Sequence, residues 1–238
     1  MEFQYGLEDY KVHSKLCLIT CRRENGESEY ITQIGKEVAA IFLALQKGEV
    51  VEASETLMVA PKCLQNRLIE LIREQIRNKE AGKEAYIGIK VNSMTDKVLI
   101  DELIKASKAG VKIELIVRGI CCVKPGVEGF TENITVISIV GRYLEHSRIY
   151  RFGVGEDEKV YISSADFMTR NTTRRVEAAV PILDADVRKK ITKMFDLMLQ
   201  DDAKGKVQNS EGKYVGRNIN ETPLDSQMYF YDHISQLS

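Results

Sequence analysis

The chain has 238 residues, which is enough for one large or two small domains with buried cores. It is 44% hydrophobic and 29% charged, and 34 basic against 35 acidic side chains give a formal net charge of −1. Proteins that bind nucleic acid or membrane surfaces through general charge attraction are usually basic, so this balance argues against both classes. A local basic channel is still compatible with a balanced total.

The five cysteines are odd in number, and no two of them have the Cys-x-x-Cys spacing of a zinc or redox motif. This usage is typical of a reduced cytosolic protein and argues against a disulfide framework. No stretch approaches the roughly 18 apolar residues of a membrane span, and no signal peptide is recognisable. A strand-like motif follows Met1–Gln4 at once, which suggests a piece of a longer chain.

The first part of the chain predicts a β-hairpin followed by a helix. Asn25-Gly26 is a strong turn signal, because both residues tolerate the positive φ angles of a tight turn. The elements expected here are, in order, a strand over 16–21, a return strand over 28–34, a helix over 37–46 and a linker over 47–56.

The middle of the chain predicts a strand, a helix and a second strand joined by short loops. Such a unit implies a parallel pair with a right-handed crossover, and functional residues gather at the carboxyl ends of its strands. Asn92 and Arg118 stand at those two ends. The expected elements are helices over 61–79, 95–109, 184–199 and 228–234, strands over 86–91, 111–117, 134–140, 148–152, 160–163 and 176–182, and a loose polar segment over 201–223.

One short pattern occurs twice, and each copy contains one of the three histidines. Tyr10–Cys17 and Tyr143–Tyr150 both have a tyrosine three residues before the histidine, then a serine, a cation and a strand-forming run. A duplicated half-site, in which the imidazoles of His13 and His146 face each other, explains the pattern. Chance similarity of two β-hairpins is the alternative.

The residue types of this repeat suit phosphoryl or phosphodiester chemistry. Histidine titrates near neutrality and can act as nucleophile, base or acid. Phosphoryl transfer also needs cations around the phosphate oxygens. Lys15 and Arg148 follow the two histidines by two residues, a spacing that returns to the same face of a strand. We therefore expect each imidazole to have its own positive charge.

Other polar residues could complete such a site. Arg118 ends an apolar strand, where a charge is costly unless paired, and this favours an anion site. The segment 163–171 supplies hydroxyl, carboxylate and amide groups that can orient an imidazole or bind phosphate. Arg174 and Arg175 fit the anion site and the surface equally well, and His233 is interpreted as a surface residue.

Several of these segments resemble the long bacterial polyphosphate kinases. The resemblance covers nearly the whole chain in order, and its motifs are specific. The matching segments are Tyr5–Leu7, Lys11–Lys15, Val91–Asp96, Val117–Cys122 with Pro125-Gly126, Ser138–Arg148 and Ser163–Asn171.

The resemblance implies a fold as well. The two carboxy-terminal domains of this family resemble the phospholipase D fold, so we expect an α/β chain with two phospholipase D-like mixed-sheet domains related by duplication and helices on the sheet faces. The expected divisions are a truncated first domain with His13 over 1–54, a second domain with Arg118 and His146 over 55–205, and a polar tail with a short terminal helix over 206–238.

The resemblance further implies a reversible transfer of the γ-phosphate of ATP to polyphosphate through a phosphohistidine. The family's phosphorylated histidine falls on His13, and its second active-site histidine falls on His146. Its nucleotide-site arginine falls on Arg118, and Arg175 matches a further phosphate contact.

The implied partners are ATP, ADP and inorganic polyphosphate, without nucleic acid. Mg²⁺ is implied too, but the arginines of that site in the family lie upstream of this chain, so no metal ligand is expected within it. For the full-length enzyme the resemblance implies a homo-oligomer in the cytoplasm and allows peripheral membrane association.

The sequence departs from the family pattern between Gly35 and Lys36. Roughly two dozen residues expected there, a loop with a Gly-x-Asn element and a nucleotide-stacking tyrosine, are missing, and a loop of that length is usually functional. A deletion and an omitted disordered loop are both compatible with the sequence. A true deletion implies that this polypeptide is inactive by itself.

Two other functions stay open. A phospholipase D-like phosphodiesterase or nuclease would use the same histidines, although its usual Gly-Ser and Asn elements are not clean here. An inactive fragment that binds polyphosphate or nucleotide is the other alternative.

Overall fold

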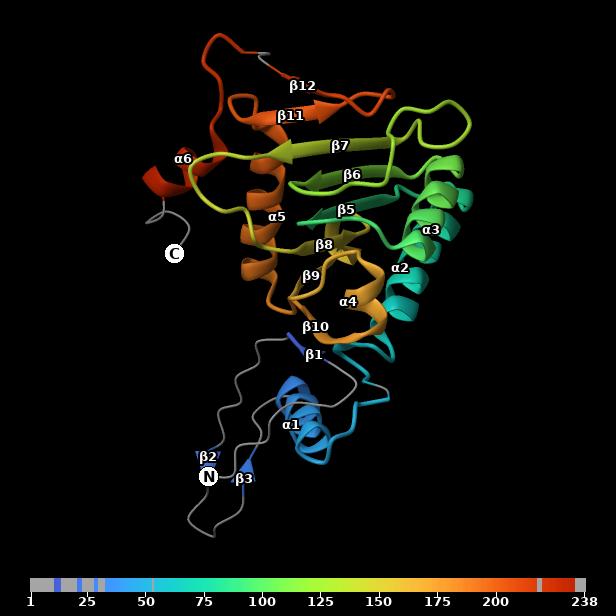
Figure 1. The fold of residues 1–238 in the computed structure, drawn as a ribbon, viewed down its shortest axis with the longest axis vertical. Coiled ribbons are helices and arrows are strands. Elements are labelled where there is room, and N and C mark those ends of the chain that lie inside the picture. Colours follow the sequence, from blue (N-terminus) through green and yellow to red (C-terminus); the bar gives the residue numbers. More distant parts are fainter. Residues whose placement is uncertain are drawn as a thin grey trace.

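The computed structural model describes residues 11–13, 21–22, 28–29, 33–52, 54–217 and 220–233. Ten of the strands form one mixed sheet (Figure 1). The path of nine strands runs, in order, through β1 (Lys11–Val12), β10 (Arg175–Pro181), β9 (Lys159–Ser163), β8 (Ile149–Phe152), β5 (Tyr86–Val91), β6 (Lys112–Val117), β7 (Ile134–Ile139), β11 (Gly205–Gln208) and β12 (Tyr214–Gly216), and β4 (Met58–Ala60) pairs with β10 off this path.

The centre of the sheet is parallel, and the next strand on each side of it is antiparallel. β5, β6 and β7 run in the same direction, while β8 runs against β5 and β11 runs against β7. β1 is parallel to β10, with Val12 opposite Val176. A short separate pair joins β2 (Cys21–Arg22) to β3 (Ser28–Glu29) in antiparallel register.

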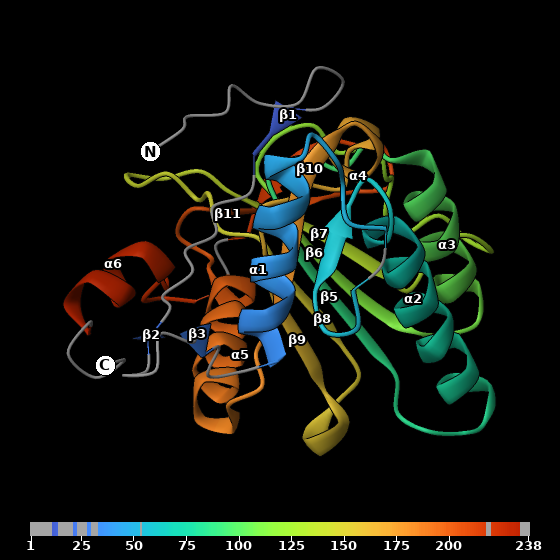
Figure 2. The same ribbon diagram turned by 90° about the horizontal axis from the view of Figure 1, so that it is seen from below.

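Helices cover both faces of the sheet (Figure 2). On one face, α2 (Leu64–Glu80) and α3 (Lys97–Lys108) pack on a core that contains Leu115 and Val117 of β6. On the other face, α5 (Ala185–Gln200) packs through Phe195 on Ile116 of the same strand. The alternation of side chains along β6 thus supplies both cores.

A smaller core holds the first helix. α1 (Gln33–Gln46) buries Val38 and Ile41 against Leu57 and Val59 around β4. The remaining helices are the one-turn η1 (Gly155–Asp157), α4 (Thr169–Thr173) and α6 (Ser226–Asp232). No helix within the described residues is long and apolar enough to cross a membrane.

The loops at the carboxyl ends of β5 and β6 are joined to one another. The amide of Met94 donates to the carbonyl of Ile120, and the amides of Thr95 and Asp96 donate to the carbonyl of Phe167. Asp96 also caps α3 by accepting from Val98 N and Leu99 N. These contacts build one continuous polar rim at this edge of the sheet.

The α/β class with a mixed sheet and helices is confirmed. The duplication into two phospholipase D-like domains and the boundaries at 1–54, 55–205 and 206–238 stay predictions. Of the predicted hairpin, the structure describes the paired residues on either side of the turn, in β2 and β3. Much of the rest of the hairpin lies outside the described residues.

Three expectations about local structure were wrong. The return strand does not extend to Ile34, because α1 begins at Gln33. The second helix begins at Leu64 rather than Pro61, since β4 ends at Ala60 and residues 61–63 form the turn between them. The segment 201–223 is not loose: it contains β11 and β12, which extend the sheet beside β7.

Candidate functional site

Arg118 and His146 meet at the carboxyl edge of the sheet. Arg118 follows β6, and its Nε donates to Oδ1 of Asn92, which follows β5, at 2.6 Å. Its Nη2 lies 3.3 Å from Nδ1 of His146. Because a guanidinium only donates, Nδ1 of His146 is the acceptor in this contact. The pair therefore places a fixed positive charge directly beside an exposed imidazole.

A buried ion pair lies beneath these two side chains. Arg148 donates from Nη2 and Nε to the carboxylate of Asp166 at 2.9 and 3.2 Å. The same carboxylate accepts from the amide and side chain of Asn92 at 2.6 and 3.0 Å. Burial opposes the charged form of Asp166, but the hydrogen bonds from Arg148 and Asn92 outweigh it and lower the pKa. Asp166 thus fixes Asn92, and through it Arg118.

Arg148 also holds the backbone of the histidine. Its Nη1 donates to the carbonyl of His146 at 3.1 Å, and the side chain is 8% exposed. The guanidinium that was expected to contact phosphate is therefore engaged inside the protein. This geometry suits a residue that orients His146.

His13 lies on the same edge, at the other side of the sheet. Its amide donates to the carbonyl of Val176, and its Nδ1 lies 3.0 Å from Oε2 of Glu177. Glu177 is fully buried, whereas the His13 side chain is 24% exposed. Glu177 also accepts from Ser164 Oγ at 2.5 Å and from Asn171 Nδ2 at 2.8 Å. The carboxylate of Glu177 thus joins His13 to Ser164 and Asn171, which stand more than 150 residues later in the sequence.

The two histidine half-sites share the loop between β9 and β10. Ser164 of this loop binds the partner of His13, and Asp166 binds the arginine that holds His146. Two sets of hydrogen-bonded side chains, one at each imidazole, are therefore joined through the backbone of residues 164–166 along one edge of the sheet.

The other predicted site residues differ in what the structure says of them. Arg175 lies opposite Lys11 in the pairing of β1 with β10 and is half-buried. Lys15 lies outside the described residues. Arg174 is exposed at the end of α4, and His233 ends α6, where its ring stacks on Tyr229.

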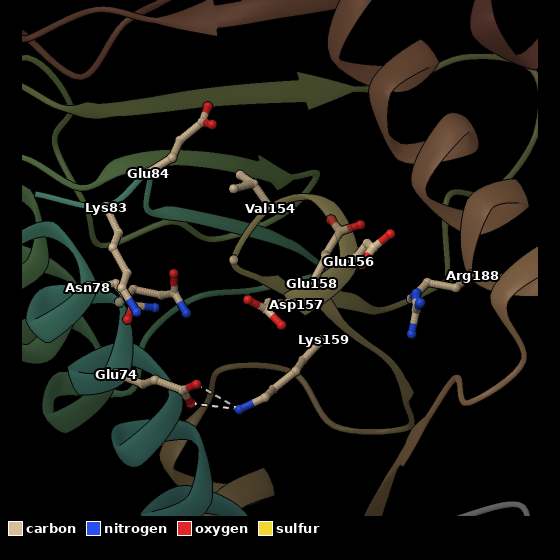
Figure 3. A pocket seen from close by; sticks show the side chains of 12 residues that line it. Glu74, Asn78, Lys83, Glu84, Val154, Glu156, Asp157, Glu158, Lys159 and Arg188 are labelled. Atoms are coloured by element: carbon tan, nitrogen blue, oxygen red, sulfur yellow. Dashed lines mark hydrogen bonds and ion pairs between the residues drawn. The ribbon is translucent and has the colours of Figure 1, made fainter.

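A hollow of about 280 Å³ lies next to the Arg118–His146 pair. Arg118 and residues 139–145 line it. Another hollow, of about 680 Å³, lies at the opposite edge of the sheet, around the β8–β9 turn (Figure 3). It contains none of the predicted site residues, and its charges are mixed, with Glu74 paired to Lys159 across it.

Within the described residues, no group of three or more His, Cys, Asp or Glu side chains could hold a metal ion.

Sequence reasoning missed the buried charged residues that support the site. Glu177 interrupts the apolar run of β10 and Lys90 that of β5, and both are almost completely buried. A charge inside a strand that is otherwise apolar is costly unless it is paired, so this pattern was a usable signal. Gln227 of α6, which contacts Tyr143 and Glu145 just before His146, left no such signal, because these partners stand more than 80 residues earlier.

Comparisons with known proteins agree on one family. A family described as "Polyphosphate kinase C-terminal domain 2" matches residues 57–227. "Polyphosphate kinase" of Staphylococcus haemolyticus is 39% identical over 249 residues, covering 94% of this chain and 34% of that protein. "Polyphosphate kinase" of Bacillus cereus is 41% identical over 253 residues, covering 95% and 36%.

A solved structure extends this similarity to the fold. The crystal structure of polyphosphate kinase from Porphyromonas gingivalis has a TM-score of 0.89 and 32% identity, and it covers 98% of this chain and 40% of that one. The chain thus spans about a third of the length of the curated relatives it matches.

The lengths of the matched stretches bear on the missing loop. The Staphylococcus haemolyticus match is 249 residues long, whereas 94% of the 238 residues of this chain is about 224. The relative therefore carries about 25 residues, the difference between 249 and 224, that this chain lacks.

Proposed function

The chain belongs to the polyphosphate kinase family, and we propose that its histidine site transfers a phosphoryl group between ATP and inorganic polyphosphate. The observation that supports this proposal is the shared edge: the Arg118–His146 pair and the His13–Glu177 pair are linked through the loop that contains Ser164 and Asp166. ATP, ADP and polyphosphate are accordingly the partners that we propose for this site.

We assign the nucleophile to Nε2 of His13. The carboxylate of Glu177 binds Nδ1, which fixes the tautomer and makes the opposite nitrogen more basic. Nε2 attacks the γ-phosphorus of ATP: an N–P bond forms, the bond to the β-phosphate oxygen breaks, and ADP leaves. The terminal oxygen of polyphosphate then attacks the same phosphorus and releases His13.

His146 and Arg118 are suited to the charge that develops on the phosphate oxygens. Arg118 carries a permanent positive charge, and the imidazole beside it can donate or accept a proton as ADP leaves. Arg175 and Lys15 are proposed as additional phosphate contacts. Mg²⁺, bound by residues outside this chain, would neutralise part of the triphosphate charge.

Labelling of His13 tests this function. The protein is incubated with Mg²⁺ and ATP that is radiolabelled at the γ-phosphate, and we expect an acid-labile, alkali-stable label on His13. His13→Ala should abolish it, and His233→Ala is the matched control that should leave it unchanged. A label that survives His13→Ala would overturn the assignment of the nucleophile. Hydrolysis of a phosphodiester without ATP would favour a phosphodiesterase instead.

A further inference from the structure

The last helix reaches back to the loop that carries His146. This loop runs from β7 to β8 and passes beside α6 (Figure 1). Gln227 of α6 donates from Nε2 to the carbonyl of Tyr143 at 2.7 Å and accepts from the amide of Tyr143 at 2.9 Å. Its Nε2 also lies 2.8 Å from Oε1 of Glu145. The 4% exposed carboxamide of Gln227 therefore holds both backbone and side chain just before the histidine.

Glu145 transmits this contact to a buried lysine. Its second oxygen, Oε2, lies 3.1 Å from Nζ of Lys90 on β5. The same ammonium donates to the carbonyl of Ser147 at 3.2 Å. One group thus binds the residue before His146 and the residue after it. Lys90 is 1% exposed, and such a burial is tolerated only when the charge is paired.

The approach of α6 to the loop is close and well anchored. A Cβ on Gly141 would lie 2.5 Å from Oε1 of Gln227, so glycine is required for this contact. Asp201, which is fully buried, accepts from the amide and hydroxyl of Ser226 at 2.8 and 2.6 Å. The first residue of α6 is therefore tied to the end of α5.

We propose that Gln227 and Lys90, acting through Glu145, are positioning residues for His146, so that the C-terminal helix sets the geometry of one half of the phosphoryl-transfer site. This inference rests on the function proposed above, because it gives His146 a role that depends on its position. The alternative is that these contacts only attach α6 to the fold, in which case the imidazole would not respond to their loss.

The imidazole spectrum of the protein separates these two cases. The chain has three histidines, so the ring signals can be assigned with three single His→Gln variants. His233 stacks on Tyr229 at 4.3 Å within α6 and reports on that helix, and His13 reports on the Glu177 half-site. In Gln227→Ala and in Lys90→Met, we expect the His146 ring signals to shift or broaden while those of His13 and His233 stay in place.

The rate of phosphoryl transfer is the second measurement of the test. In Gln227→Ala, the rate of transfer from ATP to polyphosphate should fall about 10- to 100-fold, the effect of misplacing a group by about 1 Å. The control is Gln208→Ala, which removes another buried glutamine of the C-terminal region whose side chain donates to Gly212. This variant should leave the His146 signals and the rate unchanged.

Each outcome bears on the proposal. If the His146 signals stay in place in Gln227→Ala and also in Lys90→Met, the proposal is overturned. If Gln227→Ala moves all three histidines, Gly141→Ala becomes the deciding variant: movement of His146 alone supports the proposal, and any other pattern overturns it. If wild type forms no phosphohistidine but His146 still responds alone, the proposed function fails while the positioning relationship stands.

Discussion

At the scale of single residues, Glu177 is the side chain on which the His13 half-site depends. Its side chain is fully buried in the sheet, and hydrogen bonds from His13, Ser164 and Asn171 offset the cost of burying its charge. Asn171 uses only its amide nitrogen here: its buried Oδ1 is without a hydrogen-bond partner among the described residues. The arrangement fixes the imidazole tautomer rather than merely filling space.

Replacing Glu177 with glutamine should therefore affect chemistry more than folding. The amide can donate to Nδ1 of His13, which favours the tautomer with the proton on Nε2 and removes the nucleophilic lone pair. We expect labelling of His13 to slow by about 10²- to 10⁴-fold, as when the carboxylate behind a catalytic histidine is neutralised. Quench-flow measurement of the phosphohistidine checks this, with urea unfolding as the control for stability. An unchanged labelling rate would mean that Glu177 does not orient the imidazole.

At the scale of elements, α2 and α3 are joined by an ionic contact far from the histidines. Glu102 of α3 accepts from Nε and Nη2 of Arg73 of α2, both at 2.9 Å, and from Nζ of Lys105 at 2.7 Å. The hydrogen bond from Arg73 is the main cause that lowers the pKa of Glu102 to about 2. The charged carboxylate is thus favoured in the folded state.

This shift predicts a defined pH dependence. The pKa is lower in the folded state than the ordinary value of 4.5, so the contribution is complete above pH 4.5 and is lost as the pH falls through about 2. Glu102→Gln should lower the free energy of unfolding at pH 7 by about 1 kcal/mol, a modest value because Arg73 is half exposed. Urea titrations should show the two proteins converging near pH 2. A difference that is constant with pH would refute the ionic origin, and the variant should label His13 at the normal rate.

The elements themselves were largely readable from the sequence. The predicted strands and helices between Tyr86 and Gln200 lie within two residues of their observed bounds, because each has a clear apolar period and a cap or turn at its ends. The short helices η1 and α4 in this range were not predicted. β11 and β12 were missed, since their polar residues are held by the pairing of β11 with β7 and of β12 with β11, and not by burial on two faces. Strand pairing over long separations has no local signal.

The site was only partly readable, for a related reason. Arg118, His146 and His13 stand at strand ends, where position alone suggests a function, and their roles remain proposals. The engagement of Arg148 with Asp166 could not be foreseen, because the spacing of residues on a strand fixes the face of a side chain but not its partner.

At the scale of the whole molecule, the two half-sites are unequal. The residues that contact His146 or support it, from Lys90 to Gln227, all lie within the part of the chain that the structure describes. The relatives carry about 25 residues that this chain lacks, and the family resemblance places them after Gly35. In the structure, Gly35 and Lys36 lie inside α1 without interruption. The half-site of His13 is therefore the one that we expect to be incomplete.

The remainder of α1 does not depend on the residues before Lys36. Glu37 accepts from the amides of Thr56 and Leu57, both at 2.9 Å, and from the hydroxyl of Ser54. Its hydrogen bonds outweigh the burial of the carboxylate and lower its pKa. Together with the buried Val38 and Ile41, these contacts fix the helix from residue 37 onward. An insertion after Gly35 should thus displace only the first turn.

Grafting the corresponding segment of the Staphylococcus haemolyticus relative between Gly35 and Lys36 tests this asymmetry. The entropy of closing a loop grows slowly with its length, so the insertion should cost little stability. If the segment supplies groups around the phosphates, labelling of His13 from ATP should become at least about 10-fold faster. A Gly-Ser insert of equal length is the matched control and should leave the rate unchanged. Equal rates for the two insertions would show that the His13 half-site lacks nothing that this segment provides.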